Sequence, residues 1–401
     1  MDVHARDEAN GRVMRLLSFG LLLTVLMHVL VHAAGNMRST LFPILKEEFS
    51  LTNQQIGLIA AIPPLCQLFF SIPAGLFSDR FGAKKLIALS ILMAAVGALL
   101  GGISVSPLMY IVATTLLTLN STIYHPAAQS YTIGTTKPKD RVRALGVWNG
   151  GGTLGVSLGP ISITILMGVF AFQWRQVYQF WVLPILLGLV ALFFLKDSSS
   201  VITRQNADKN SDVDSANKLF SLNMIFFIVS NGIRRFGGGL TSGFLGIWLV
   251  ETQGWNLASI GIMFGVGSLM GVVAAPLGGE LATRFGEKRW AALTLFVSYL
   301  CFVLAITLKG FWPFLIFYLG QRFFGMLGMA ANGSITARLS PPRQRGMGFA
   351  LSSFSGSLVG FVGPIIAAFI ADSYGIYLIF FVAAVIYYIG LGVFHFGVKI
   401  D

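Results

Sequence analysis

Twelve long apolar runs constrain the fold of this chain more than any other feature. They cover approximately residues 14–45, 51–77, 84–104, 107–134, 143–171, 176–195, 219–250, 256–282, 288–308, 312–337, 345–371 and 374–397. Each run is long enough to cross a bilayer, which takes about 20 helical residues. Hydrophobic residues make up 55% of the chain and charged residues 11%, too few charges for a soluble surface. The sequence therefore predicts an all-α membrane protein of twelve transmembrane helices, with the lipid bilayer as a partner.

The charges between these runs predict an orientation in the membrane. Lysines and arginines cluster around the loops that follow runs 2, 4, 8 and 10. They are Arg80, Lys84, Lys85, Lys137, Lys139, Arg141, Arg143, Arg284, Lys288, Arg289, Arg338, Arg343 and Arg345. Because cytoplasmic loops are enriched in lysine and arginine, both termini are expected in the cytoplasm and the protein in the inner (plasma) membrane. The net charge of +12 is explained by these loops, so no nucleic-acid partner is expected.

The chain also repeats itself. Residues 196–218, rich in serine and asparagine, are typical of a cytoplasmic linker and divide an N-terminal part, 1–195, from a C-terminal part, 219–401. A constant displacement of 204 residues relates Gly75 to Gly279, Arg80 to Arg284 and Gly159-Pro160 to Gly363-Pro364. Such a register predicts two six-helix bundles related by pseudo-symmetry.

The turn between the second and third runs carries a specific motif. Its residues are Gly75, Asp79, Arg80, Gly82, Lys84 and Lys85. This motif resembles the signature loop of the major facilitator superfamily, a family of twelve-helix secondary transporters. The resemblance implies the major facilitator fold and a gating role for the motif. Thr283 stands where the second copy would repeat Asp79, so the first copy is expected to act as the latch.

Two further patterns are similar to parts of that family. Gly151, Gly155 and Gly159-Pro160 in the fifth run resemble a motif that the family associates with antiporters, and a helix-packing face explains these glycines equally well. Tyr124-His125-Pro126 is similar to fosmidomycin-resistance-type efflux proteins, although Ala127 stands where an acid is usual.

Polar side chains inside the apolar runs are the candidates for function, because they are costly in a membrane. They concentrate in runs 1, 4, 7 and 10, which line the central cavity in the fold that the sequence resembles. The expected substrate-binding residues are Arg322, Arg235, Arg234, Arg38, Asn36, Asn231, Tyr124 and Asn120. Arg234 and Arg235 point about 100° apart on a helix, so one of them is expected to face the cavity, and Arg235 is favoured.

Three histidines are the candidates for proton coupling. His28 and His32 share a helix face, and His125 precedes Pro126. An imidazole with an unperturbed pKa near ~6.5 changes its charge in the physiological range. The alternative is that each is a buried histidine that donates to a backbone carbonyl.

The sign of the buried charges favours an anion. Acids are nearly absent from the runs, whereas arginines and histidines are present. We therefore predict a monomeric secondary transporter that moves a small, anionic organic solute by alternating access, coupled to protons. The alternatives are a drug/proton antiporter that exports cationic or neutral compounds, and a non-transporting membrane sensor. The sequence has no nucleophile motif and no cluster with metal-ligand spacing, so no enzyme, metal site or other cofactor is expected.

Overall fold

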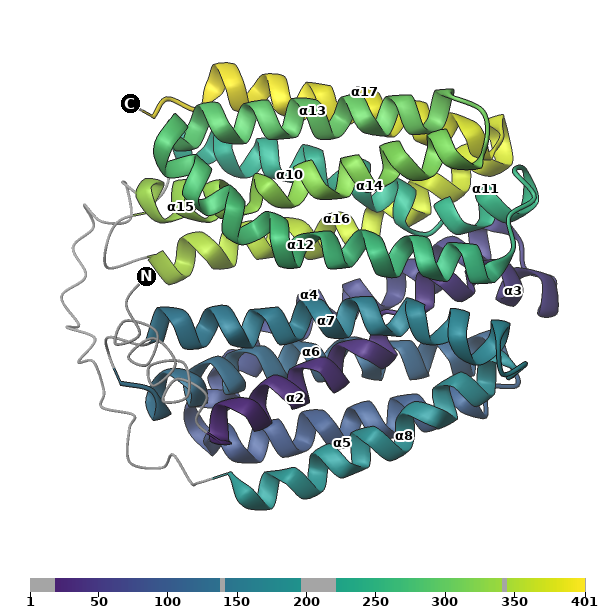
Figure 1. Ribbon diagram of the computed structural model, residues 1–401, viewed down its shortest axis with the longest axis vertical. Helices are drawn as coiled ribbons and strands as arrows, with labels where there is room; N and C mark the ends of the chain where they lie inside the picture. Colours follow the sequence, from purple (N-terminus) through teal and green to yellow (C-terminus); the bar gives the residue numbers. More distant parts are fainter. Residues whose placement is uncertain (1–18, 138–140, 196–220, 341–344, 401) are drawn as a thin grey trace, which may run out of the picture. The chain divides into compact units, whose positions relative to one another are not determined.

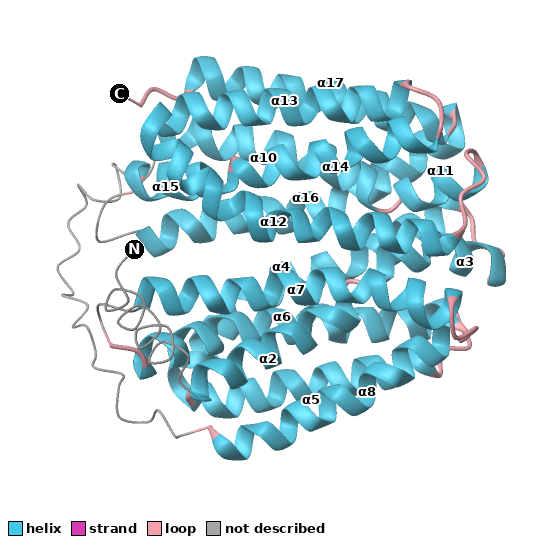
Figure 2. Ribbon diagram, viewed as in Figure 1, coloured by secondary structure: helices cyan, strands magenta, loops and turns pink. Residues whose placement is uncertain are grey.

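The computed structural model of the protein describes residues 19–137, 141–195, 221–340 and 345–400. Helices account for the regular structure of these residues, and no strand occurs among them (Figure 2). The predicted all-α fold class is confirmed. The predicted linker 196–218 lies outside the described residues.

The helices fall into two series along the chain (Figure 1). The first series is α2 (Phe19–Gly35), α3 (Arg38–Glu48), α4 (Asn53–Phe81), α5 (Ala83–Gly102), α6 (Pro107–Thr135), α7 (Arg141–Gly168), α8 (Trp174–Ala191) and the short 3-10 helix η2 (Leu192–Phe194). The second is α10 (Leu222–Ser242), α11 (Leu245–Glu251), α12 (Leu257–Phe285), α13 (Glu287–Thr307), α14 (Phe311–Leu327), α15 (Met329–Leu339), α16 (Arg345–Tyr374) and α17 (Ile376–Gly397).

Ten segments of the described chain are long and apolar enough to cross a membrane. The helices α6 and α10 are similar in length, at 29 and 21 residues, but are not among the ten. These two helices contain many of the polar candidates, including Asn120, His125, Arg234 and Arg235. The ten segments together with α6 and α10 make up the twelve predicted spans. The polar side chains of α6 and α10 explain why these two helices are not recognised by their composition.

The repeat is visible in the helix boundaries. Both ends of α12 lie 204 residues after the ends of α4, and α14 and α15 together begin and end 204 residues after α6. The turns that follow α4 and α12 use the same backbone conformation, with φ of 85° at Gly82 and 86° at Gly286. Only glycine adopts this region without strain, which explains why both copies of the turn have a glycine at this position.

Three spans that were predicted as continuous helices are interrupted. The first run breaks at Asn36 and Met37, between α2 and α3. The seventh breaks at Gly243 and Phe244, and the tenth breaks at Gly328. At Gly243 and Gly328 the glycine lowers helix stability. At the first break, the side-chain amide of Asn36 donates to the carbonyl of His32 at 2.8 Å, a local hydrogen bond that competes with helical pairing.

The chain forms two compact units by its contacts. Unit 1 comprises residues 1–37 and 69–206, and unit 2 comprises residues 38–68 and 207–401. In unit 1 the main packing is between α5 and α6, α2 and α7, and α5 and α8. In unit 2 it is between α10 and α17, α13 and α14, and α10 and α16.

Glycines bring α7 into direct contact with the backbone of α2. A Cβ atom added to Gly155 would lie 2.4 Å from the carbonyl oxygen of Val29, and one added to Gly159 would lie 2.4 Å from that of Ala33. In unit 2 a Cβ at Gly363 of α16 would lie 2.8 Å from the backbone of Gly239 in α10. The glycine pattern of the fifth span is therefore a helix-packing face, and the repeat preserves it.

The predicted gating motif lies at the turn between α4 and α5. The side chains of Asp79 and Arg80 and the surroundings of Gly75 lie outside the described residues. Lys84 donates through Nζ to the carbonyl of Leu195 at 2.7 Å, and Lys85 is exposed. The latch role of the motif stays a prediction.

The second copy of this turn is held by other acids. Glu280 pairs with Arg284 on the same helix. Glu287, at the start of α13, accepts from Ser334 and pairs with Arg338 of α15, with 3.3 Å between Nη1 and Oε2. The sequence analysis recognised that Thr283 replaces Asp79 but overlooked Glu287.

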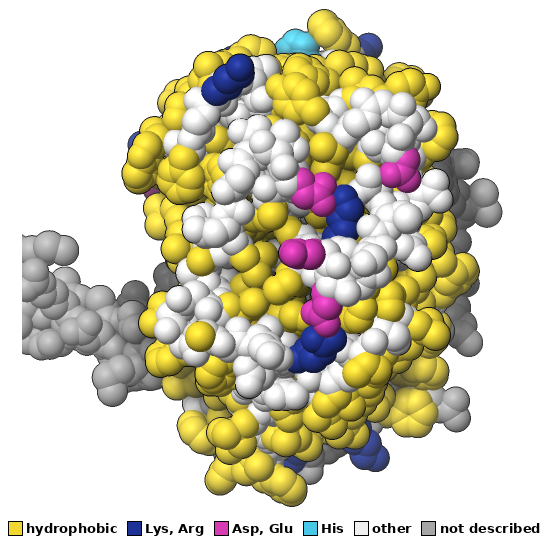
Figure 3. All heavy atoms as spheres, turned by 90° about the vertical axis from the view of Figure 1, so that its right-hand side faces the viewer, with side chains coloured by type: hydrophobic (Ala, Val, Ile, Leu, Met, Phe, Trp, Pro, Cys, Tyr) yellow, Lys and Arg dark blue, Asp and Glu magenta, His cyan; other side chains and the backbone are white. Residues whose placement is uncertain are grey.

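The other end of unit 2 carries α3 and α11. Lys46 Nζ lies 2.8 Å from Glu251 Oε1, and Asn53 donates to Asp372 at 2.8 Å. Figure 3 shows this face, where acidic and basic side chains are set among polar residues and hydrophobic side chains lie around them. Exposed apolar residues such as Leu187 and Phe193 mark lipid-facing surfaces on the helices themselves.

The close contacts predict a difference between two neighbouring glycines of α12. A Cβ at Gly278 would lie 2.0 Å from the carbonyl oxygen of Leu327, whereas the nearest atom to a Cβ at Gly279 is the Cβ of Ala330 at 3.6 Å. Gly278→Ala should therefore lower the free energy of unfolding by ~1–3 kcal/mol, the usual effect of overpacking. Gly279→Ala is the matched control. Thermal unfolding of the two purified variants measures the difference, and equal midpoints would contradict this packing.

Candidate functional site

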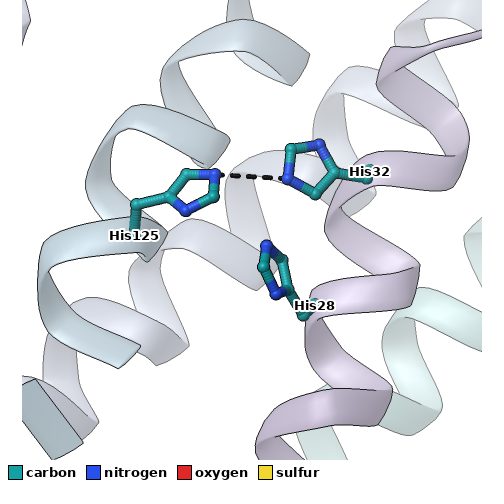
Figure 4. Close-up of side chains that lie close together, drawn as sticks. All are labelled: His28, His32 and His125. Atoms are coloured by element: carbon teal, nitrogen blue, oxygen red, sulfur yellow. Dashed lines mark hydrogen bonds between the residues drawn. The ribbon is translucent and has the colours of Figure 1, made fainter. Parts of the chain in front are cut away.

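The three predicted coupling histidines come together in unit 1 (Figure 4). His28 and His32 lie one turn apart on α2, and His125 comes from α6. The ring centroids form a nearly regular triangle, with separations of 4.9 Å, 5.0 Å and 5.2 Å. The Nε2 atoms of His32 and His125 are 3.2 Å apart, so one of these nitrogens donates a hydrogen bond to the other. We call these three residues the histidine cluster.

His28 is fixed in one tautomer. Its Nδ1 donates to the carbonyl of Trp148 at 2.8 Å, and its ring stacks on the indole of Trp148 with centroids 3.9 Å apart. The Nε2 atom therefore carries a lone pair in the neutral ring. This atom is buried and has no hydrogen-bond partner among the described residues.

The space for His28 depends on a glycine of α7. A Cβ at Gly152 would lie 2.6 Å from Cε1 of the His28 ring and 2.7 Å from its Nε2. Gly150, two residues earlier, has nothing within 4 Å of such an atom. The glycine-rich face of α7 thus positions the histidine cluster as well as packing on α2.

The polar neighbours on α2 and α6 are engaged with backbone groups. The hydroxyl of Tyr124 donates to the carbonyl of Thr24 at 2.6 Å and ties α6 to α2. Asn120 donates to its own helix, to the carbonyl of Leu117 at 2.6 Å, while its Oδ1 has no partner among the described residues. Asn36 lies at the break after α2 and its Nδ2 is 3.5 Å from Nδ1 of His32.

Unit 2 holds the predicted arginines. Arg234 of α10 is buried, and its Nη2 donates to Oδ1 of Asn231 at 2.6 Å while its Nε donates to the carbonyl of Ser230 at 3.3 Å. Its guanidinium carbon lies 5.5 Å from the ring centre of Phe394, a cation–π distance. Arg234 is thus directed into the packing between α10 and α17.

Arg235 has a different environment. Its side chain is exposed and lies against Gly356 of α16, where an added Cβ would come within 2.3 Å of Nη1. The two arginines therefore point in different directions, as their spacing predicts. The hydrogen bond with Asn231 is made by Arg234, whereas the sequence analysis favoured Arg235 as the arginine that faces the cavity.

Arg322 of α14 is half-buried beside tyrosines. It lies within electrostatic range of Tyr318 and Tyr387, and its Cγ would be 3.2 Å from a Cβ at Gly267. Its Nε is buried without a hydrogen-bond partner, and no carboxylate of the described chain forms an ion pair with it. A buried guanidinium donor without an acceptor is available to an anionic ligand.

The remaining candidate, Arg38, begins α3 and is half-buried. The histidines, Asn36, Tyr124 and Asn120 belong to unit 1, and the arginines and Asn231 belong to unit 2. The sequence analysis missed Trp148 and the stacked pair Tyr299 and Tyr387, whose ring centroids are 4.6 Å apart. Aromatic residues are common in apolar spans, so nothing in their spacing distinguished these residues.

The membrane-length helices define a multi-pass membrane protein. The profile of the Major Facilitator Superfamily matches residues 24–233 and 227–399. The chain belongs to the Major Facilitator Superfamily. It is a transporter and not an enzyme.

Several known proteins are similar over most of the chain. Multidrug resistance protein 2 of Bacillus subtilis (strain 168) is 24% identical over 85% of this chain and 86% of its own length. The probable nitrate transporter NarT of Staphylococcus epidermidis is 23% identical with the same coverage. Among solved structures, a bacterial homologue of the human lysosomal transporter Spinster has a TM-score of 0.79 at 15% identity, covering 93% of this chain and 95% of that one. These likenesses confirm the fold and the transporter class.

The contact of Tyr124 with α2 leads to a prediction. Tyr124→Phe keeps the ring but removes the hydrogen bond to the Thr24 carbonyl, so the free energy of unfolding should fall by ~1 kcal/mol, the usual net value of one such bond. Tyr374→Phe is the matched control, because Tyr374 is 70% exposed. Thermal unfolding in one detergent compares them. Equal stability of the two variants would show that the bond between α6 and α2 contributes nothing.

Proposed function

We propose that this transporter moves a small, anionic organic solute. The observation that carries the proposal is the buried Nε of Arg322, which has no acceptor among the described residues. Leaving such a donor unsatisfied costs free energy in a low-dielectric environment. A carboxylate or phosphate oxygen is the acceptor that a guanidinium binds most strongly, and it can be held by two parallel hydrogen bonds.

The distribution of charge in the spans supports an anion. Arg234, Arg235 and Arg322 lie on membrane-spanning helices, and no carboxylate of the described chain forms an ion pair with any of them. The described acids with partners, such as Glu251 and Asp372, lie at helix ends. One relative is a probable nitrate transporter, which handles an anion.

The second candidate is a drug/proton antiporter that exports cationic or neutral compounds. The relative from Bacillus subtilis, a multidrug resistance protein, favours it. The absence of a carboxylate partner for the three arginines in the described chain favours the anion.

The histidine cluster is the proposed element of proton coupling. A proton taken up there can be shared between His32 and His125, whose Nε2 atoms are 3.2 Å apart. Arginine side chains stay charged at any physiological pH, so they cannot exchange protons in this way. Histidine can, and the cluster is the place in the described spans where several imidazoles meet.

The proposed mechanism is alternating access of a monomer. Its moving parts are the predicted bundles, residues 1–195 and 219–401, joined by the linker 196–218. The proposed location is the inner membrane with both termini in the cytoplasm.

Substitution of Arg322 tests the anion proposal. Arg322→Lys keeps the charge but loses the planar fork, so affinity should fall by ~1–3 kcal/mol, or roughly 5- to 150-fold. Arg322→Gln should lose more. Counterflow of organic acids and sugar phosphates in proteoliposomes measures the effect, with Arg289→Gln, an exposed arginine, as the control. If Arg322→Gln transports an anion as well as the parent does, the anion proposal fails and the cationic-drug alternative becomes the better account.

Replacement of the histidines tests the coupling proposal. In the triple variant His28→Gln, His32→Gln, His125→Gln, net transport should lose its dependence on pH because no group remains to take up the proton. Exchange of substrate for substrate should continue, since it requires no net proton movement. His395→Gln is the matched control, because His395 is exposed on α17. A triple variant whose transport keeps the parental pH profile would refute the role of the cluster.

A further inference from the structure

The histidine cluster has the composition of a transition-metal site. Among the described residues it is a group of three imidazoles, with no carboxylate or thiolate, whose ligand atoms all lie within 4.8 Å of one another. Imidazole is the ligand that suits Zn²⁺, Cu²⁺ and Ni²⁺, whereas Mg²⁺ and Ca²⁺ prefer oxygen. Three histidines with one open position also form a known zinc arrangement. Sequence spacing gave no sign of this group, because His125 lies 93 residues after His32.

His28 has the features of a prepared ligand. Metal-bound histidines usually donate their other ring nitrogen to a carbonyl or carboxylate, which fixes the tautomer and the ring orientation. The Nδ1 of His28 makes such a bond with Trp148, and the lone pair of Nε2 is directed into the cluster without a partner (Figure 4). The side chain is only 2% exposed, so water is not a ready alternative partner for this nitrogen.

The distances fit a tetrahedral ion with modest adjustment. Zinc–nitrogen bonds of ~2.0–2.1 Å place two ligand nitrogens about 3.3 Å apart. The Nε2 atoms of His32 and His125 are already 3.2 Å apart. Since no ligand pair exceeds 4.8 Å, the third nitrogen has to approach by about 1.5 Å at most, which a small rotation of its side chain can provide.

We propose that His28, His32 and His125 bind one divalent transition-metal ion of the zinc type through their imidazole nitrogens. The ion and protons compete for the same lone pairs, so binding weakens as pH falls. The open fourth position is left for a water molecule or an anionic donor. This inference concerns binding to unit 1 alone and does not depend on which solute is transported.

Metal binding to the purified, tag-free full chain tests the proposal. The chain has five histidines, so the control variant replaces the two outside the cluster, His4→Gln and His395→Gln. The parent and this control should each bind one Zn²⁺ per chain, and an excess of Mg²⁺ should not displace it. Each single replacement in the cluster should weaken Zn²⁺ binding by more than ~100-fold. This loss exceeds the effect of removing a residue that only hydrogen-bonds to a metal ligand.

Two measurements keep the result clear if a variant is poorly folded. Co²⁺ bound to the parent should give the intense visible absorption of a tetrahedral site. Gly152→Ala, which crowds His28 without removing a ligand, should weaken Zn²⁺ binding at least about tenfold relative to Gly150→Ala. The proposal is overturned if the parent binds no Zn²⁺, if the cluster variants bind it as tightly as the control, or if the Co²⁺ spectrum is octahedral. Because no transport is measured, these outcomes are independent of the anion proposal.

Discussion

The close approach of α7 to α2 is the contact on which the position of the histidine cluster in unit 1 depends. Gly155 and Gly159 let the backbones touch, and Gly152 leaves the room that the His28 ring occupies. Without a hydrophobic driving force between helices in lipid, such backbone contact is a main source of helix association. The same surface therefore packs two spans and sets the position of a titratable group. At the equivalent positions of α16, Gly363 packs on α10 and Gly356 accommodates Arg235, whereas Val359 replaces Gly155.

The two units use the repeated framework for different chemistry. Unit 1 presents a cluster of imidazoles, a group that can bind a proton or a metal ion, and unit 2 presents positively charged guanidinium groups. In the proposed function, this division lets the imidazoles take up protons while the guanidinium groups bind the anion. The polar residues of the two units also explain why α6, which carries His125, and α10, which carries Arg234, are less apolar than the other spans.

Much of the fold follows from the sequence, because bilayer thickness fixes span length and the 204-residue register fixes the repeat. The family follows from the motif in the turn between the second and third spans. The helix breaks at Asn36, Gly243 and Gly328 were missed, since a break of one or two residues hardly alters an apolar run. Of the site, residue types and spans could be predicted. Two contacts could not be predicted from spacing along the sequence. The contact between His125 and His32 depends on how α6 packs on α2, and the hydrogen bond of Asn231 with Arg234 depends on side-chain conformation along α10.

The most direct test of the account is proton movement driven by the solute. Liposomes that contain the purified protein and a trapped pH indicator would receive membrane-impermeant organic anions, such as sugar phosphates and dicarboxylates, or organic cations of similar size. The account predicts that at least one anion changes the internal pH, that no cation does so, and that protein-free liposomes do not respond. A response to organic cations alone would contradict it.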